Sequence, residues 1–293
     1  MSITPFKQPI IPQARKETIQ KLLKKGERID GRKLDEYRKI NIVLNPITKS
    51  EGSAIVSIGN TVVMTGVKLE IGTPYPDAPD EGVLQVHAEF VPLASPTFEP
   101  GPPDENAIEA ARVIDRSLRE SEAIKLDELV IIPGKVVWIV FNDLYLLDHD
   151  GNIIDAGMLS SILALNLTKI PDVVIEGERV IVNRENKSKQ LPINLNVLST
   201  TIGIYEDYLI VDPSLDEELI LDSTLIVAVD EKGRVVGLQK TGSRSISRRL
   251  LEQAIELAIK KSIELHDLVK KILNNQQEYI KPYLSIDSFW ERR

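Results

Sequence analysis

The stretch ENAIEAARVIDRSLRE, residues 105–120, constrains the fold more than any other segment of the chain. Its apolar residues Ala107, Ala111, Ile114 and Leu118 recur at helical spacing, which predicts an α-helix with one apolar stripe. Asp104, directly before the segment, is a suitable N-cap. Because the apolar stripe must be covered, the rest of the chain has to supply a hydrophobic layer for this helix.

The same helix carries a row of arginines. Arg112, Arg116 and Arg119 are spaced i, i+4 and i+7, which places their guanidinium groups on one face. The chain as a whole is acidic, with 44 Asp and Glu against 36 Lys and Arg and a net charge of −8, so this row runs against the overall balance. Such a row is often only a solvated surface with intrahelical ion pairs. Arginine is also the preferred partner of phosphate, which makes the face a candidate phosphate-binding edge.

Composition excludes several classes of protein. A chain of 293 residues without cysteine has no disulfide, thiol catalyst or cysteine metal site, and its three scattered histidines offer no metal-ligand spacing. The sequence contains no apolar run of 18 residues, so it predicts no membrane span. Its first residues also lack the apolar core of a signal peptide. We therefore expect a cytoplasmic protein without a metal site. Net acidity argues against a stand-alone, non-specific nucleic-acid binder.

Strand and helix patterns alternate in two rounds along the chain. The first round has a helix over 12–25, strands over 39–44, 53–58, 62–71 and 83–90, the arginine helix, a strand over 135–147 and a helix over 153–167. The second has strands over 193–199, 201–211 and 223–239 and a closing helix over 247–273. The Gly59-Asn60 pair predicts a tight hairpin. Each round gives hairpin strands followed by a major helix, which indicates an α+β fold.

Several motifs resemble a known family. RIDGRKLDEYR (28–38), EGSAIVSIGNTVVMTGVK (51–68) and RVIDRSLRE (112–120) resemble the RNase PH family of phosphorolytic exoribonucleases. The longer stretches PYPDAPDEGVL (74–84), FEPGPPDENAIEAARVIDRSLRES (98–121) and PGKVVWIVFNDLYLLDHDGNIIDA (133–156) are similar to the non-catalytic RNase PH-like subunits of the archaeal exosome core.

The resemblance implies an RNase PH-like α+β fold of two related β-α-β halves, like domain 2 of ribosomal protein S5, with an N-terminal helix and a long C-terminal helix. Its expected parts are an N-terminal helical extension (1–27), a first half (28–170), a second half (171–275) and a C-terminal tail (276–293).

The resemblance also implies partners. In a hexameric ring this subunit would alternate with a catalytic paralogue, together with RNA-binding cap proteins. Single-stranded RNA would thread through the ring to the paralogue's site, where inorganic phosphate attacks and Mg²⁺ is a further candidate. This chain itself would bind no cofactor. Arg112 and Arg116 would contact RNA phosphates, and Arg119 is the weaker candidate because it can pair structurally.

Two departures from the family pattern predict that the chain is not an enzyme. Active members carry a Glu-Ala-Asp-x-Pro-Ile motif, and the matching stretch SKQLPINLNV (188–197) has Gln190 in place of the aspartate. An amide neither exchanges a proton near neutral pH nor binds Mg²⁺ as a carboxylate does. In HDGNIIDAG (149–157), where paralogues cradle phosphate, Asp155 is expected to repel that ion. The prediction is a non-catalytic structural and RNA-binding subunit of a complex that degrades RNA.

Alternatives remain beside this interpretation. The chain could be an active phosphate-dependent 3′-to-5′ exoribonuclease with displaced acids, or a scaffold that has lost RNA contact. TGSRSISRR (241–249) could bind an anion at a helix start, although Ser247 as an ordinary N-cap is favoured. In RIDGR, Asp30 is expected to pair locally with Arg28 or Arg32.

Overall fold

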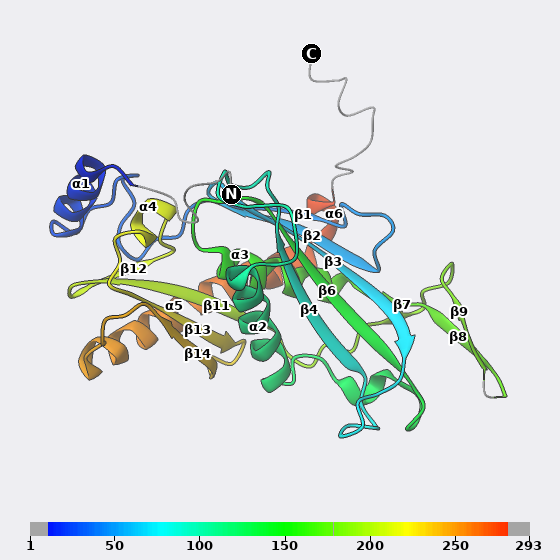
Figure 1. Cartoon of the computed structure of the whole chain (residues 1–293). Helices are drawn as coiled ribbons and strands as arrows, with labels where there is room; N and C mark the ends of the chain where they lie inside the picture. Colours follow the sequence, from blue (N-terminus) through cyan, green and yellow to red (C-terminus); the bar gives the residue numbers. More distant parts are fainter. Residues whose placement is uncertain (1–10, 178, 281–293) are drawn as a thin grey trace, which may run out of the picture.

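The computed structural model describes residues 11–177 and 179–280, and Figure 1 shows their arrangement. Of the predicted N-terminal extension and C-terminal tail, residues 1–10 and 281–293 lie outside the described residues. Helix α1 (Gln13–Leu23) confirms the predicted N-terminal helix. Its buried Ile19 and Leu23 pack against Tyr205, Ile210 and Ile220 from the second half of the chain.

The first sheet contains β1 (Ile40–Leu44), β2 (Gly52–Ile58), β3 (Thr61–Gly72), β4 (Val83–Phe90), β5 (Val130–Ile132) and β6 (Val136–Asp148). Its order is β1-β2-β3-β6-β4, and β5 pairs with β6. The predicted hairpin is confirmed, because Ile58 pairs with Thr61 and Gly59 has a φ of 59°. Only β4 runs parallel to its neighbour β6, so the chain must cross over between them, and the crossover contains the arginine helix.

That helix is α2 (Glu105–Glu120), with the bounds predicted from the pattern. Asp104 caps it, since its side chain accepts a hydrogen bond of 2.8 Å from the backbone N–H of Ala107. The four residues of the apolar stripe are all buried. A short 3₁₀ turn, η1 (Leu126–Leu129), follows before β5.

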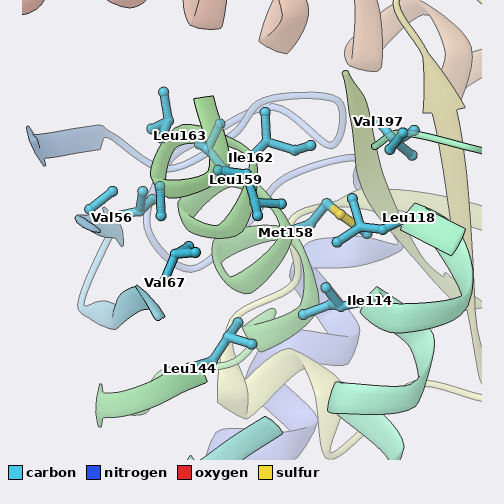
Figure 2. Close-up of a cluster of buried hydrophobic side chains, with 14 of the residues drawn as sticks. Val56, Val67, Ile114, Leu118, Leu144, Met158, Leu159, Ile162, Leu163 and Val197 are labelled. Carbon is cyan, nitrogen blue, oxygen red and sulfur yellow. The ribbon is translucent and has the colours of Figure 1, made fainter. Parts of the chain in front are cut away.

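Helix α3 (Ile153–Leu167) lies at the centre of the molecule, and twelve of its fifteen residues are buried. Figure 2 shows its side chains Met158, Leu159, Ile162 and Leu163 among residues of the first sheet, of α2 and of the second sheet. A helix enclosed on several sides needs small residues. At Gly157, a Cβ would lie only 3.0 Å from side-chain atoms of Ile114 and Leu144.

The second sheet contains β11 (Val197–Tyr205), β12 (Tyr208–Val211), β13 (Ser223–Asp230) and β14 (Val235–Thr241) in the order β12-β11-β13-β14. The strand boundary predicted near residue 200 is wrong: β11 runs through it as one fully buried strand. The reversal comes instead after Tyr205, where Glu206 has a φ of 51°. Burial on both faces removes the polar alternation from which a strand end could have been recognised.

The remaining elements connect or cover the two sheets. They are β7 (Lys169–Ile170), β8 (Asp172–Glu176), β9 (Arg179–Asn183), β10 (Lys189–Gln190), α4 (Leu215–Glu218), α5 (Arg248–Asn274) and α6 (Gln276–Tyr279). Strand β7 pairs with β10, and β8 with β9 as a hairpin that projects from the body in Figure 1. The long helix α5 buries Leu250, Ala254 and Ala258 against the second sheet. Two sheets with their helices confirm the α+β fold class.

Candidate functional site

The arginine face of α2 divides into two free guanidinium groups and one that is engaged. Arg112 and Arg116 are exposed and make no hydrogen bond or ion pair with any residue that the structure describes. The Nη2 of Arg119 donates to the carbonyl oxygen of Leu84 at 2.8 Å and to Asp115 at 2.7 Å. Arg119 therefore links α2 to β4, while Arg112 and Arg116 have donors to offer a ligand.

Strand β14 forms one border of this face. Arg116 lines a cavity of about 170 Å³ together with Ser117, Glu120 and the β14 residues Gly237 to Gln239. The helix and the strand approach closely, since a Cβ at Gly237 would lie 3.5 Å from the Ser117 hydroxyl oxygen. Gln239 donates a hydrogen bond of 2.6 Å to Glu109, which joins the strand to the first half of the helix. The arginine face therefore lies where the first half of the chain packs on the second.

A second cavity of about 500 Å³ opens where α2 and α3 begin. Its polar lining consists of Asn106, Glu109, Asn152, Thr201, Glu218, Thr224 and Thr241. Among the described residues, the lining includes two glutamates and no lysine or arginine. A cavity of this composition favours neutral or positively charged groups and disfavours an anion.

Asp155, on the first turn of α3, does not point into this cavity. Its carboxylate is 2% exposed and accepts five hydrogen bonds of 3.0 Å or less, from Tyr37, Asn152, Ser199 and the backbone and side chain of Thr201. Burial raises the pKa of Asp155 to about 6, although these hydrogen bonds act in the other direction. The expectation that Asp155 repels phosphate is wrong, because the side chain is turned inward to tie α3 to β11.

Glu218 is the carboxylate that faces the cavity. It accepts a hydrogen bond of 2.7 Å from the backbone N–H of Asn152, and burial raises the pKa of Glu218 to about 7. Near neutral pH it is therefore divided between its charged and uncharged forms. The sequence pattern did not single out Glu218, because its partner Asn152 is 66 residues away.

A buried arginine cluster fixes the two halves beside this cavity. Arg28 and Glu217 form an ion pair of 2.5 Å in which both side chains are fully buried. Arg38 holds Asp212 through two hydrogen bonds, of 2.9 Å and 2.7 Å. Burial opposes ionisation of Asp212, but the hydrogen bond and charge of Arg38 outweigh it, so the pKa of Asp212 is lowered.

The local pairing expected in RIDGR is confirmed only for Arg32, whose Nε lies 2.6 Å from Asp30. Arg28 instead spans 189 residues to Glu217, and its fork also donates to the carbonyl oxygens of Val211 and Asp212. Sequence reasoning missed this contact. The only available signal was the acidic segment 212–218, whose charge complements the arginines of 28–38.

Gln190 lies on β10, at the opposite end of α3 from the cavity. Its side chain donates to the backbone oxygen of Asn166, near the end of the helix. A helix of fifteen residues is about 22 Å long, so Gln190 is far from the side chains that line the cavity at the helix start. Its correspondence to the aspartate of active relatives stays a prediction.

Several other candidates have structural explanations. Arg244 pairs with Asp222 at 2.6 Å, and Ser247 accepts a hydrogen bond of 3.3 Å from Leu250, as expected of an N-cap. No group of three or more His, Asp or Glu residues within 11–177 and 179–280 is placed to hold a metal ion. Within the same ranges, no helix has the length and apolar character needed to cross a membrane.

The sequence matches two family models. Residues 36–171 match the 3' exoribonuclease family, domain 1, and residues 196–261 match domain 2 of the same family. The two ranges together cover more than half of the 293 residues.

Proteins of similar sequence span almost the whole chain. The exosome complex component Rrp42 of Sulfurisphaera tokodaii is 48% identical over 274 residues, which cover 94% of this chain and 100% of that protein. The exosome complex component Rrp42 of Aeropyrum pernix is 47% identical over 283 residues, which cover 96% of this chain and 100% of that protein.

Two solved structures of exosomes contain a chain similar to this one. A chain of the Archaeoglobus fulgidus exosome with RNA bound to the active site matches with a TM-score of 0.80 and 44% identity, over 87% of this chain and 97% of that one. A chain of an archaeal exosome core matches with a TM-score of 0.77 and 40% identity, over 88% of this chain and 96% of that one.

Proposed function

Because the chain belongs to the RNase PH family of 3' exoribonucleases, we propose that it is a non-catalytic subunit of an exosome ring that contacts single-stranded RNA. Relatives at 47% to 48% identity are named exosome complex components, and the similar solved structures are exosome cores. In the proposed assembly the chain alternates with a catalytic paralogue in a hexameric ring and meets RNA-binding cap proteins. A cytoplasmic location belongs to the same proposal.

The observation that carries the RNA contact is the pair of free guanidinium groups on α2. Elsewhere in the fold, Arg28 and Arg38 are fully engaged by carboxylates and carbonyl oxygens. Arg112 and Arg116 have no such partner among the described residues, although the chain is acidic. A phosphodiester is the acceptor that best matches the arginine fork. RNA phosphates held there would position the 3′ end for a neighbouring subunit.

The cavity at the start of α3 supports the non-catalytic part of the proposal. Phosphorolysis needs cations around the attacking phosphate, and the described lining supplies Glu109 and Glu218 instead. Gln190, the predicted counterpart of the aspartate of active relatives, can neither donate nor accept a proton in a reaction near neutral pH. We therefore assign acid–base catalysis, inorganic phosphate and Mg²⁺ to the paralogue's site and no cofactor to this chain.

A phosphorolysis assay tests the proposal. The purified chain, alone and mixed with the catalytic paralogue, is supplied with single-stranded RNA and inorganic phosphate, and released nucleoside diphosphates are measured. We expect release only with the paralogue, and a lower rate at subsaturating RNA with Arg112→Glu plus Arg116→Glu. The matched control, Lys270→Glu plus Lys271→Glu, changes the same charge at exposed positions of α5 and should behave as the unmodified chain.

Two outcomes would contradict the proposal. Release by the chain alone would make it an exoribonuclease in its own right. If Arg112→Glu plus Arg116→Glu does not change the rate of release by the mixture, the chain does not contact RNA through α2 and is a scaffold. Gln190→Asp alone should not create activity, because the glutamates of the cavity remain. Turnover in that variant would mean that a working phosphate site exists in this chain.

A further inference from the structure

Three cationic side chains, one from β3 and two from the segment between β9 and β10, converge on one buried carboxylate. Glu51, whose side chain is 2% exposed, presents its Oε1 at 3.1 Å from Lys68, 3.7 Å from Arg184 and 3.6 Å from Lys187. Because the three nitrogens contact the same oxygen, no two of them can be farther apart than about 7 Å. We refer to these four residues as the Glu51 cluster.

Positive charge exceeds negative charge in the Glu51 cluster. The second oxygen of Glu51 accepts a hydrogen bond of 3.2 Å from the backbone N–H of Leu69, so it is not free for a further cation. Of the neighbouring carboxylates, Glu70 pairs with Arg184 at 2.8 Å, and Asp172 is hydrogen-bonded to Ser188. One ion pair would have been enough to neutralise Glu51, and the additional cations repel one another at this distance.

Two more lysines flank the cluster. The backbone oxygen of Lys49 accepts a hydrogen bond of 3.0 Å from Lys68, and the backbone N–H of Lys169 donates to the Glu51 carbonyl oxygen at 3.3 Å. Both residues are exposed, and their side chains have no ion pair within the described part of the chain. Glu185, next to Arg184 in the sequence, is exposed as well.

The cationic groups are accessible from solvent. The side chains of Lys68, Arg184 and Lys187 are 42%, 41% and 27% exposed. Arg184 uses its fork on the Leu69 carbonyl oxygen and Glu70. Lys187, by contrast, approaches Glu51 without a hydrogen bond in the described structure, so its N–H donors remain available. Lys68 uses two of its three N–H donors, on the Lys49 carbonyl oxygen and on Glu51, and keeps the third. Lys68 and Lys187 are therefore the groups that can bind a ligand directly.

We propose that the Glu51 cluster is a second oxyanion site, which takes a phosphate group through Lys68 and Lys187. Glu51 holds the cations at contact distance before the ligand arrives, and a tetrahedral oxyanion replaces the repulsion between them with attraction. Inorganic phosphate and the phosphodiester of single-stranded RNA offer the same chemistry. This proposal does not depend on the α2 face.

The test uses the full-length chain with Arg112→Glu plus Arg116→Glu as background, so that the α2 face contributes no anion binding. Inorganic phosphate is titrated by calorimetry, and a fluorescent ten-nucleotide RNA by anisotropy, both at low salt. Lys68→Gln plus Lys187→Gln should weaken binding at least about fivefold. The matched control, Lys270→Gln plus Lys271→Gln on α5, removes the same charge from exposed helix positions and should have no effect.

A second variant, which is expected to strengthen binding, keeps the test decisive if Lys68→Gln plus Lys187→Gln folds poorly. Glu70→Gln removes a 49% exposed carboxylate beside Arg184 and should strengthen binding about twofold. Glu252→Gln, which removes the partner of Arg248 on α5, is its control. Binding of both probes supports a general phosphate site, and binding of RNA alone supports a phosphodiester site. Failure of both to bind, or equal affinity in the lysine variant and its control, would overturn the proposal.

Discussion

The chain uses arginine in two regions with opposite surroundings. At the junction of the two halves, Arg28 is 3% exposed and Arg38 is 9% exposed, and both are held by carboxylates. On α2, Arg112 and Arg116 stand in solvent without a partner among the described residues. Both regions begin as short arginine-containing motifs in the sequence. The difference is that the fold satisfies the first pair and leaves the second pair without a partner among the described residues.

This contrast separates stability from binding. A buried charge that loses its partner destabilises the folded state strongly, whereas an exposed one without a partner costs little. Changes at the junction should therefore act on unfolding, and changes on α2 on affinity for RNA.

Arg28→Ala should lower the free energy of unfolding by about 3–5 kcal/mol, because it leaves Glu217 charged and buried. Urea denaturation of the full chain measures this change. Arg112→Ala is the matched control and should stay within about 0.5 kcal/mol. Equal effects of the two substitutions would remove the distinction between the regions.

Arg112→Glu plus Arg116→Glu should weaken binding of single-stranded RNA by about 10- to 100-fold at low salt. The plot of log affinity against log salt should also become shallower, by about 0.7 for each lost phosphate contact. The urea midpoint should hardly change. Lys270→Glu plus Lys271→Glu controls for overall charge, and a similar loss in that variant would indicate non-specific attraction only.

The stability of the folded chain should depend on pH through Glu218, which lies beside the junction of the two halves. Burial raises its pKa to about 7 from an ordinary value of 4.5, so the folded state binds this proton more tightly than the unfolded state does. Its contribution to stability is therefore present below about pH 4.5 and is lost as pH rises to about 7. Glu218→Gln keeps an acceptor for the Asn152 N–H and removes the titration. It should be more stable than the unmodified chain at pH 8 by about 1–2 kcal/mol.

Urea midpoints of both proteins at pH 5 and pH 8 measure this difference. Asp155, whose pKa is raised to about 6, contributes in the same direction in both proteins and cancels in the comparison. A constant difference between the two proteins across this range would show that Glu218 does not titrate there.

Arg119→Ala should have the smallest effect, and it should change the stability of the fold rather than the affinity for RNA. It loses hydrogen bonds to Leu84 and Asp115, which should cost about 1 kcal/mol of stability. RNA affinity should change less than about twofold, because the guanidinium is already engaged. A loss as large as that of Arg116→Ala would place Arg119 among the RNA contacts.

Local patterns predicted many elements of the fold. The bounds of α2, α3 and β4 agree with their predicted ranges, and Asp104 and Ser247 cap the helices that follow them. These features depend on residues a few positions apart, so the sequence pattern contains the relevant interactions. The strand boundary near residue 200 was wrong because β11 is buried on both faces and shows no alternation.

The candidate site was predicted in part. Spacing alone placed Arg112, Arg116 and Arg119 on one face, and the possible internal pairing of Arg119 is present. Spacing could not show that the Asp155 carboxylate turns inward, since Ser199 and Thr201, which donate hydrogen bonds to it, lie on β11, more than 40 residues away. Nor could it gather Glu109 and Glu218 around one cavity.

Most of the elements, the arginine row on α2 and the family follow from the sequence alone, because each depends on neighbouring residues or on motif order. Which charges are satisfied depends on the folded structure. Arg28 meets Glu217 and Lys187 meets Glu51 across long stretches of chain, through the packing of separate segments. The physical reason is that burial and charge compensation are set by distance in space, and the folded chain alone fixes those distances.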